Sequence, residues 1–222
     1  MILLAADTSG QQGSLALAQC GPGEVCEILE VASLTGGTFS AQLIPQVAAL
    51  LGKHGFSKQQ IEAFAVVSGP GSFTGLRVGL AAFKALAEVL AKPVATVSLL
   101  EAVAVASRSK SGLAALEAGR GEVYVGNYSG ESLPDGAARE RLLSLQEFLS
   151  EARGKLVVTP DATLADSIRN AGLEVEVIAR RRSDAIAQLG WRKILSGQAV
   201  PPGELEANYI RRSDAEIFSK PV

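Results

Sequence analysis

Histidine is almost missing from this sequence of 222 residues, in which His54 is the only one. Metal sites built on histidine pairs, and triads that use histidine as the base, need more imidazoles or better-placed ones. His54 lies in Gly52-Lys53-His54-Gly55, just beyond an expected helix end, where an imidazole interacts with the helix C-terminus. The sequence therefore predicts no catalytic residue and no metal site, and it argues against a zinc protease.

Cysteine and long apolar runs are also scarce. Cys20 and Cys26 are the only thiols, and although an expected hairpin could bring them close, we expect free, buried thiols in a reducing compartment. No stretch approaches about 20 consecutive apolar residues, so no membrane span is predicted. Asp7 interrupts the first apolar run before a secretory signal could develop. We therefore expect a soluble protein of the cytoplasm.

Aromatic residues make up only 5% of the chain, and its formal net charge is only −2. A core of Ala, Val, Leu and Ile is typical of helices that cover a sheet, and 47% hydrophobic residues are enough to fold one, so the class is α/β. This charge does not provide the basic field that nucleic-acid binding needs. Arginines at 180–182 and 211–212 are exceptions, which we interpret mainly as solvated faces.

The first half of the chain shows three apolar runs followed by alternating helix and strand patterns. Strands are predicted at residues 2–6, 14–18, 25–29, 63–67 and 94–97. Helices are predicted at 40–51, 72–91 and 98–107, with a short one after Ser57. This order indicates one mixed sheet with flanking helices.

A polar stretch at residues 107–112 indicates a boundary between two lobes, 1–107 and 108–222. In the second lobe we expect strands at 113–116, 122–128, 156–158 and 174–178, and helices at 143–149, 162–171 and 184–195. The sequence does not decide whether the C-terminal tail packs back on the first lobe. It also leaves open whether the two lobes share one arrangement of strands and helices.

A glycine-rich turn, Gly-Pro-Gly-Ser-Phe-Thr-Gly at residues 69–75, follows a strand and opens a helix. This arrangement can present backbone amides to a phosphate. However, its glycine spacing is one residue too long for the dinucleotide fingerprint, and no P-loop lysine follows. A helix N-terminus gains about 0.3–2 kcal/mol from an anion, whereas micromolar affinity requires about 8 kcal/mol. Gly71, Gly75 and Gly79 also recur every four residues, so close helix packing is an equal alternative.

Asp7-Thr8-Ser9 is the natural complement of this turn, because a carboxylate and hydroxyls at a strand end can contact phosphate or hydrated Mg²⁺. The alternative is that these side chains satisfy the backbone of their own turn. The candidate site for weak phosphate, ATP or ADP binding comprises Asp7, Thr8, Ser9, Gly69, Gly71 and Ser72. An actin-like ATPase or small-molecule kinase is the alternative function, although it lacks a candidate base.

Several motifs resemble the TsaB (YeaZ-type) family, which belongs to the bacterial machinery that makes threonylcarbamoyladenosine in tRNA. They are residues 5–9 (AADTS), 40–45 (SAQLIP), 68–79 (SGPGSFTGLRVG), 97–102 (VSLLEA), 120–124 (RGEVY) and 208–212 (NYIRR). Two positions depart from the family: Phe39 stands where histidine is usual, and Glu117-Ala118-Gly119-Arg120 replaces an Asp-Ala-Arg run.

The resemblance implies a two-lobed actin-like (ASKHA) fold with a mixed sheet and flanking helices in each lobe. It also implies partners: the catalytic paralogue TsaD, the ATPase TsaE, a second copy when alone, and tRNA only through the complex. The paralogue carries a His-x-x-x-His metal motif where this chain has Leu99 and Val103. The resemblance thus implies a non-catalytic assembly subunit that requires no cofactor of its own, with at most weak ATP or ADP and Mg²⁺.

The family pairs through helices of its first lobe. We therefore expect two apolar stripes to form the partner interface, although an apolar helix face more often buries its own core. The stripes are Leu43, Ile44, Val47, Leu50 and Leu51, and Gly75, Leu76, Gly79, Leu80 and Phe83.

Overall fold

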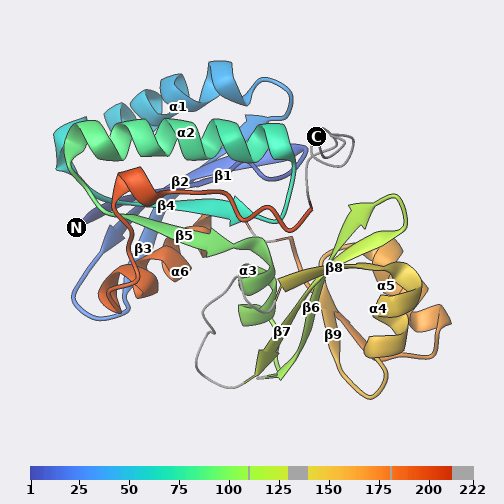
Figure 1. Cartoon of the computed structure of the whole chain (residues 1–222). Helices are drawn as coiled ribbons and strands as arrows, with labels where there is room; N and C mark the ends of the chain where they lie inside the picture. The colour runs from blue at the N-terminus through green and yellow to red at the C-terminus, as the bar shows by residue number, and fades with distance from the viewer. Residues whose placement is uncertain (110, 130–139, 181, 212–222) are drawn as a thin grey trace. The chain divides into compact units, whose positions relative to one another are not determined.

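The computed structural model describes residues 1–109, 111–129, 140–180 and 182–211 and contains two compact units (Figure 1). The first unit comprises Met1–Leu99 together with the described part of residues 181–207. The second comprises Leu100–Arg180 and the described residues from Asn208 onward. No helix in the described ranges is long and apolar enough to cross a membrane.

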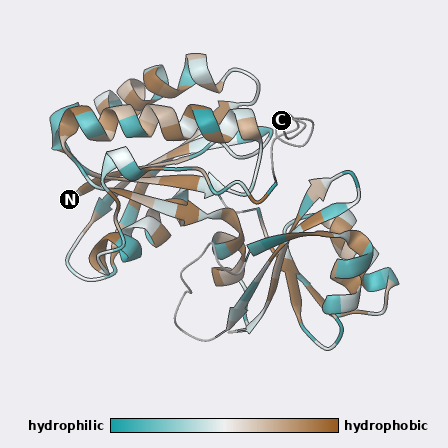
Figure 2. Ribbon diagram, in the orientation of Figure 1, coloured by the Kyte–Doolittle hydropathy of each residue, from teal (hydrophilic) through white to brown (hydrophobic). Residues whose placement is uncertain are grey.

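The first unit is built on a five-stranded mixed sheet in the order β3-β2-β1-β4-β5. Its strands are β1 (Ile2–Asp7), β2 (Gln12–Cys20), β3 (Cys26–Thr35), β4 (Ile61–Gly69) and β5 (Val94–Ser98). β1 pairs antiparallel with β2 and parallel with β4, and β4 pairs parallel with β5. β1 and most of β4 are buried on both faces, which explains their continuous apolar runs (Figure 2). The predicted mixed sheet is confirmed.

Helices cover both faces of this sheet (Figure 1). α1 (Phe39–Lys53) and α2 (Phe73–Leu90) lie side by side on one face. The short helix η1 (Lys58–Gln60) comes between them in the chain. α6 (Ser183–Leu195) packs on the other face, and η3 (Pro202–Glu204) packs beside α2. A Cβ at Gly190 would collide with the Ala65 side chain, so this glycine lets α6 approach β4 closely.

The predicted division into 1–107 and 108–222 needs a correction. The first unit ends its continuous stretch at Leu99, and residues 182–207 return to it from the second half of the sequence. The return is stabilised by burial of α6 against the sheet, including Ile186 and Trp191. Val200 then pairs with Val94 at the edge of β5. Residues 212–222 of the predicted tail lie outside the described residues.

The second unit repeats the sheet plan of the first, with five strands in the order β8-β7-β6-β9-β10. The strands are β6 (Ser111–Gly119), β7 (Glu122–Ser129), β8 (Glu140–Ser144), β9 (Val157–Thr159) and β10 (Val175–Val177). As in the first unit, the central strand pairs antiparallel on one side and parallel on the other. α4 (Leu145–Glu151) and α5 (Ala162–Asn170) pack on this sheet, and α3 (Leu99–Val105) precedes it in the chain.

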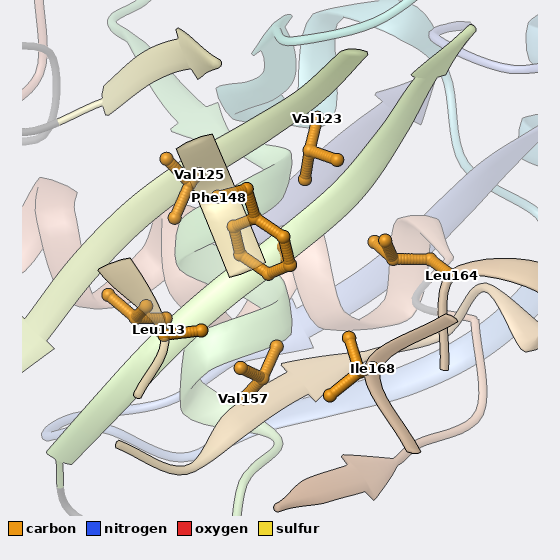
Figure 3. Close-up of a cluster of buried hydrophobic side chains, with 9 residues drawn as sticks. Leu113, Val123, Val125, Phe148, Val157, Leu164 and Ile168 are labelled. Atoms are coloured by element: carbon orange, nitrogen blue, oxygen red, sulfur yellow. The ribbon is translucent and has the colours of Figure 1, made fainter. Parts of the chain in front are cut away.

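Figure 3 shows the core of the second unit, where Phe148 of α4 and Ile168 of α5 meet side chains of the sheet. The members of this core are Leu113, Ala115, Val123, Val125, Phe148, Ala152, Val157, Leu164 and Ile168. β8 was not predicted from the sequence. Its residues were partly assigned to the following helix, which instead begins after Ser144.

Glu30 connects the edge strand β3 to the end of α1. Lys53 Nζ and His54 Nε2 each lie 2.8 Å from a carboxylate oxygen of Glu30. The only histidine in the sequence therefore has a structural partner here. Hydrogen bonds from Lys53 and His54 lower the pKa of Glu30, and the bond from Lys53 has the larger effect.

This pKa shift predicts a pH-dependent contribution of Glu30 to stability. Because the folded-state pKa lies below the unfolded value of about 4.3, the contribution is complete above that pH and is lost as the pH falls through the folded-state pKa. We expect Glu30→Gln to destabilise the chain at pH 7, and the difference from the wild type to shrink on acidification to about pH 3. Urea unfolding at several pH values measures this, with Glu27→Gln on the same strand as control. A difference that persists undiminished at the lowest pH would contradict it.

Candidate functional site

Polar side chains gather where the parallel strands of the first unit end. β1 ends at Asp7, β4 ends with Ser68 and Gly69, and β5 ends at Ser98. Carboxyl ends of parallel strands meet at one edge of a sheet, which is where ligands bind in α/β proteins. Asp7, Ser68 and Ser98 are each less than a tenth exposed. This edge is therefore the candidate functional site.

The turn after β1 uses its polar groups internally. Asp7 Oδ1 accepts hydrogen bonds from the Ser9 amide at 2.8 Å and from the Ser9 hydroxyl at 2.6 Å. Thr8 is 1% exposed, and its hydroxyl donates to the Gly75 carbonyl oxygen at 2.8 Å. The carboxylate thus closes its own turn, and the threonine fastens the turn to α2.

The glycine-rich turn lies directly on this first turn. The Ser72 amide donates to the Ser9 carbonyl at 2.7 Å, and the Ser72 hydroxyl caps α2 by accepting from the Gly75 amide at 3.3 Å. A Cβ at Gly71 would collide with Ser9, and one at Gly75 would collide with the Thr8 carbonyl oxygen. The glycines are needed because two backbones touch.

Gly79 extends the same contact by one helical turn. A Cβ there would collide with the Thr8 hydroxyl oxygen, so Gly71, Gly75 and Gly79 all face the turn that follows β1. The Phe39 ring, in place of the family's usual histidine, lies against Gly13 and Gly75. Phe39 is buried and fills this corner by apolar contact.

The structure brings the predicted phosphate-site residues together. Gly69 ends β4 beside Ser98, and Asp7, Thr8, Ser9, Gly71 and Ser72 form the contacts just described. These contacts support the packing interpretation of the glycines. Phosphate or nucleotide binding stays a prediction, and it has fewer free donors than the sequence suggested, because the Thr8 hydroxyl is already bonded.

Sequence reasoning missed Ser68 and Ser98 at this edge. The Ser68 hydroxyl lies 3.5 Å from the Val97 carbonyl oxygen, and Ser98 immediately precedes α3. The available signal was positional, since each serine directly follows a predicted strand. Within the described ranges, no three His, Cys, Asp or Glu side chains are grouped as metal ligands would be.

The ten residues predicted for the partner interface have unequal exposure. Nine of them, all except Ile44, are buried within the chain itself. Side chains already buried add little contact area to a complex, so the predicted stripes are mainly the inner faces of α1 and α2. Ile44 is 47% exposed and remains accessible to a partner.

Two of the arginines that the sequence singled out form ion pairs, and Arg182 donates a hydrogen bond to the Ser33 hydroxyl at 2.9 Å. Arg180 lies 3.4 Å from Asp161, and Arg211 pairs with Glu122. Arg211 also lies over the Tyr124 ring. Arg181 and Arg212 lie outside the described residues. Arg180 and Arg211 are therefore held by carboxylates of the chain, a role that the interpretation as solvated faces did not include.

Solved structures share this fold. YeaZ from Pseudomonas aeruginosa superposes with a TM-score of 0.71 and 23% identity, covering 93% of this chain and 100% of that one. A second structure, of a protein described as similar to the peptidase YeaZ of that organism, gives the same TM-score with 95% and 99% coverage. This likeness concerns the fold, and with the two repeated sheets it confirms the two-lobed actin-like (ASKHA) prediction.

The chain is also similar in sequence to curated proteins named TsaB. A protein from Bacillus subtilis named tRNA threonylcarbamoyladenosine biosynthesis protein TsaB is 35% identical over 130 residues, which are 58% of this chain and 55% of the relative. The TsaB of Escherichia coli is 36% identical over 132 residues, with the same coverage. The matches thus span about half the length of these relatives.

A family model covers more of the chain. The model described as TsaD, tRNA N6-adenosine threonylcarbamoyltransferase, matches residues 32–188. This range is more than half of the sequence and includes the glycine-rich turn. The chain therefore belongs to the TsaD family, and the relatives that it resembles in sequence are named TsaB.

Proposed function

We propose that the chain is a non-catalytic subunit required for threonylcarbamoyl transfer to adenosine 37 of tRNAs that read codons starting with A. In this proposal it pairs with the catalytic subunit TsaD, TsaE joins the pair, and tRNA is held through the complex. The transferred group comes from threonylcarbamoyl-AMP, which a separate synthase supplies in the cytoplasm. The relatives named TsaB, at about 35% identity, are the observation that carries the proposal.

The candidate site supports a role without chemistry of its own. Asp7 is bonded to its own turn, and the Thr8 hydroxyl is bonded to Gly75. The position equivalent to the paralogue's metal motif holds Leu99 and Val103, both buried and apolar. The side chains at these positions pack and bond within the chain, whereas a catalytic site needs a base or a metal ligand that can reach the substrate.

The outward faces of α1 and α2 support pairing. Helical spacing places Ala41, Ile44, Pro45 and Ala48 on one face of α1, and Ile44 is exposed. The same spacing places Val78, Ala81, Ala85 and Val89 on one face of α2, where Val89 is 81% exposed. The two helices lie side by side (Figure 1). We call these eight apolar residues of α1 and α2 the outer helix face. In this proposal TsaD covers it, and a second copy covers it when the chain is alone.

The test is a reconstitution in which each component is omitted in turn. TsaD, TsaE, the synthase, tRNA, threonine, bicarbonate and ATP are mixed with and without this chain, and threonylcarbamoyladenosine is measured in the tRNA by mass spectrometry. We expect omission of this chain to lower formation at least about 100-fold, as loss of an obligatory component does. Undiminished formation without it would refute the proposal.

The same proteins test the enzyme alternative. Purified chain with Mg²⁺ and ATP should release phosphate no faster than buffer. Substantial turnover that Asp7→Asn abolishes would instead identify an ATPase or kinase.

A further inference from the structure

Cys20 and Cys26 occupy opposing positions on neighbouring antiparallel strands. Cys20 is the last residue of β2, Cys26 is the first residue of β3, and they are direct register partners. Directly opposed residues of an antiparallel pair project from the same face of the sheet. The two thiols therefore face each other across the hairpin turn.

Backbone hydrogen bonds define the kind of pair. The Cys20 amide donates to the Met1 carbonyl at 2.8 Å, and its carbonyl accepts from the N-terminal amine at 3.1 Å. Gly21, the next residue, donates to the Val25 carbonyl at 3.0 Å. Cys20 thus turns its backbone away from β3, which is the geometry of a non-hydrogen-bonded pair, with Cα atoms about 4.5 Å apart. Disulfides span Cα separations of about 4.4–6.8 Å, so a bridge fits this pair.

The hairpin is held in place by α6. Trp191 Nε1 donates to the Gly23 carbonyl at 2.9 Å, and Arg192 Nε lies 3.2 Å from the Glu24 carboxylate. These contacts anchor the turn that joins the two cysteines. Contacts with α6, in addition to the short turn between the two cysteines, therefore hold the thiols opposite each other.

The two thiols differ in access and in acidity. Cys20 is 2% exposed, whereas Cys26 is partly exposed. Hydrogen bonding between the thiols raises the pKa of Cys20 and lowers that of Cys26. Because the thiolate is the reactive form, Cys26 is the thiol suited to attack and Cys20 the one suited to resolve a mixed disulfide.

We propose that Cys20 and Cys26 form a reversible redox-modification site, which a low-molecular-weight disulfide such as oxidised glutathione converts into an intramolecular disulfide. The Cys26 thiolate attacks one glutathione sulfur, forms a mixed disulfide and releases one glutathione thiolate. Cys20 then loses its proton and attacks the Cys26 sulfur, and the second glutathione leaves as a thiolate. The chain gives up two electrons and two protons, and oxidised glutathione becomes two reduced molecules. This site is independent of the proposed role in tRNA modification.

The bond would join the first residue of the edge strand β3 to β2. In a reducing cytoplasm such a disulfide is transient, which is the behaviour of redox-sensing pairs. Oxidation is expected to raise the melting temperature of the chain by about 5–10 °C, because the short closed loop restricts the unfolded state.

The experiment uses the full chain, which contains only these two cysteines. Reduced protein is equilibrated with mixtures of oxidised and reduced glutathione, denatured in acid, alkylated with N-ethylmaleimide and weighed intact. We expect a monomer that takes up no maleimide and no glutathione, with at least about tenfold more of it at a given glutathione ratio than for the same chain in urea. Two maleimides on the folded chain, a lasting mixed disulfide, a covalent dimer, or equal yields in urea would each overturn the proposal.

Two variants assign the roles of the thiols. Cys20→Ala should retain glutathione on Cys26 as a stable mixed disulfide, because the resolving thiol is missing. Cys26→Ala should react at least about tenfold more slowly while folded, because Cys20 is buried. The reverse pattern would overturn the assignment. Circular dichroism spectra that match the wild type verify that both variants fold.

Discussion

Replacing Gly75 with alanine is expected to lower the free energy of unfolding by about 2–3 kcal/mol. The new Cβ would collide with the Thr8 carbonyl oxygen, which is a backbone atom and cannot rotate away. Relief requires α2 to move off the turn after β1. That movement would lengthen the Ser72 to Ser9 backbone hydrogen bond, now 2.7 Å, and the Thr8 to Gly75 bond, now 2.8 Å.

Gly52→Ala is the matched control for this variant. Gly52 lies within α1, and a Cβ there would meet no atom within 4 Å. Alanine is favoured over glycine in a helix by about 1 kcal/mol, so Gly52→Ala should be neutral or stabilising. Urea unfolding followed by circular dichroism compares the two variants. Equal effects would show that helix propensity, rather than the contact with Thr8, determines the outcome at Gly75.

The sequence predicted the first sheet because its signals are local. β1 and β4 are continuous apolar runs that end at turn residues, and Pro93 separates α2 from β5. The domain division was wrong because the return of α6 is not local. The apolar face of α6, with Ile186 and Leu189, is visible in the sequence, but nothing in it identifies which sheet that face covers.

The boundary between β8 and α4 carries a sequence signal that the prediction did not use. Ser144 and Glu147 form a capping box, in which the Glu147 carboxylate accepts from the Ser144 amide at 2.9 Å. This pattern marks a helix start, so the apolar residues before it belong to another element. The prediction of a helix from residue 143 ignored that boundary.

The candidate site was predicted in part. Asp7, Thr8 and Ser9 do meet the glycine-rich turn, because two strand ends lie side by side in a parallel pair. What the sequence left undecided was the direction of each polar group. The Thr8 hydroxyl donates to the Gly75 carbonyl, and no pattern in the sequence shows that these two distant residues are bonded.

Periodicity also could not separate the inner and outer faces of α1 and α2. The larger side chains, such as Leu43 and Phe83, mark the face that the chain buries in its own sheet. The outer helix face carries mostly smaller residues, with Ile44, Val78 and Val89 as its larger members, so it gives a weaker pattern. A large residue at Gly79 is therefore a poor test of pairing, since it would first collide with Thr8.

Replacing Ile44 with glutamate is the sharper test of the outer helix face, and we expect it to weaken binding to TsaD at least about 100-fold. A carboxylate placed in an apolar interface loses its water without gaining a partner, and such burial costs several kcal/mol. The chain itself should stay folded, because Ile44 is 47% exposed and contributes little to its core. The melting temperature measures this last point.

Val177→Glu is the matched control for this charge. Val177 is 46% exposed, nearly the same as Ile44, but it lies on β10 of the second unit. Calorimetric titration of TsaD with each variant should give weak or undetectable binding for Ile44→Glu and wild-type affinity for Val177→Glu. If the wild type does not bind TsaD, the proposed function fails. If the wild type and Ile44→Glu bind equally well, the partnership stands but the outer helix face is not its interface, because a buried carboxylate at Ile44 cannot be neutral in an apolar contact.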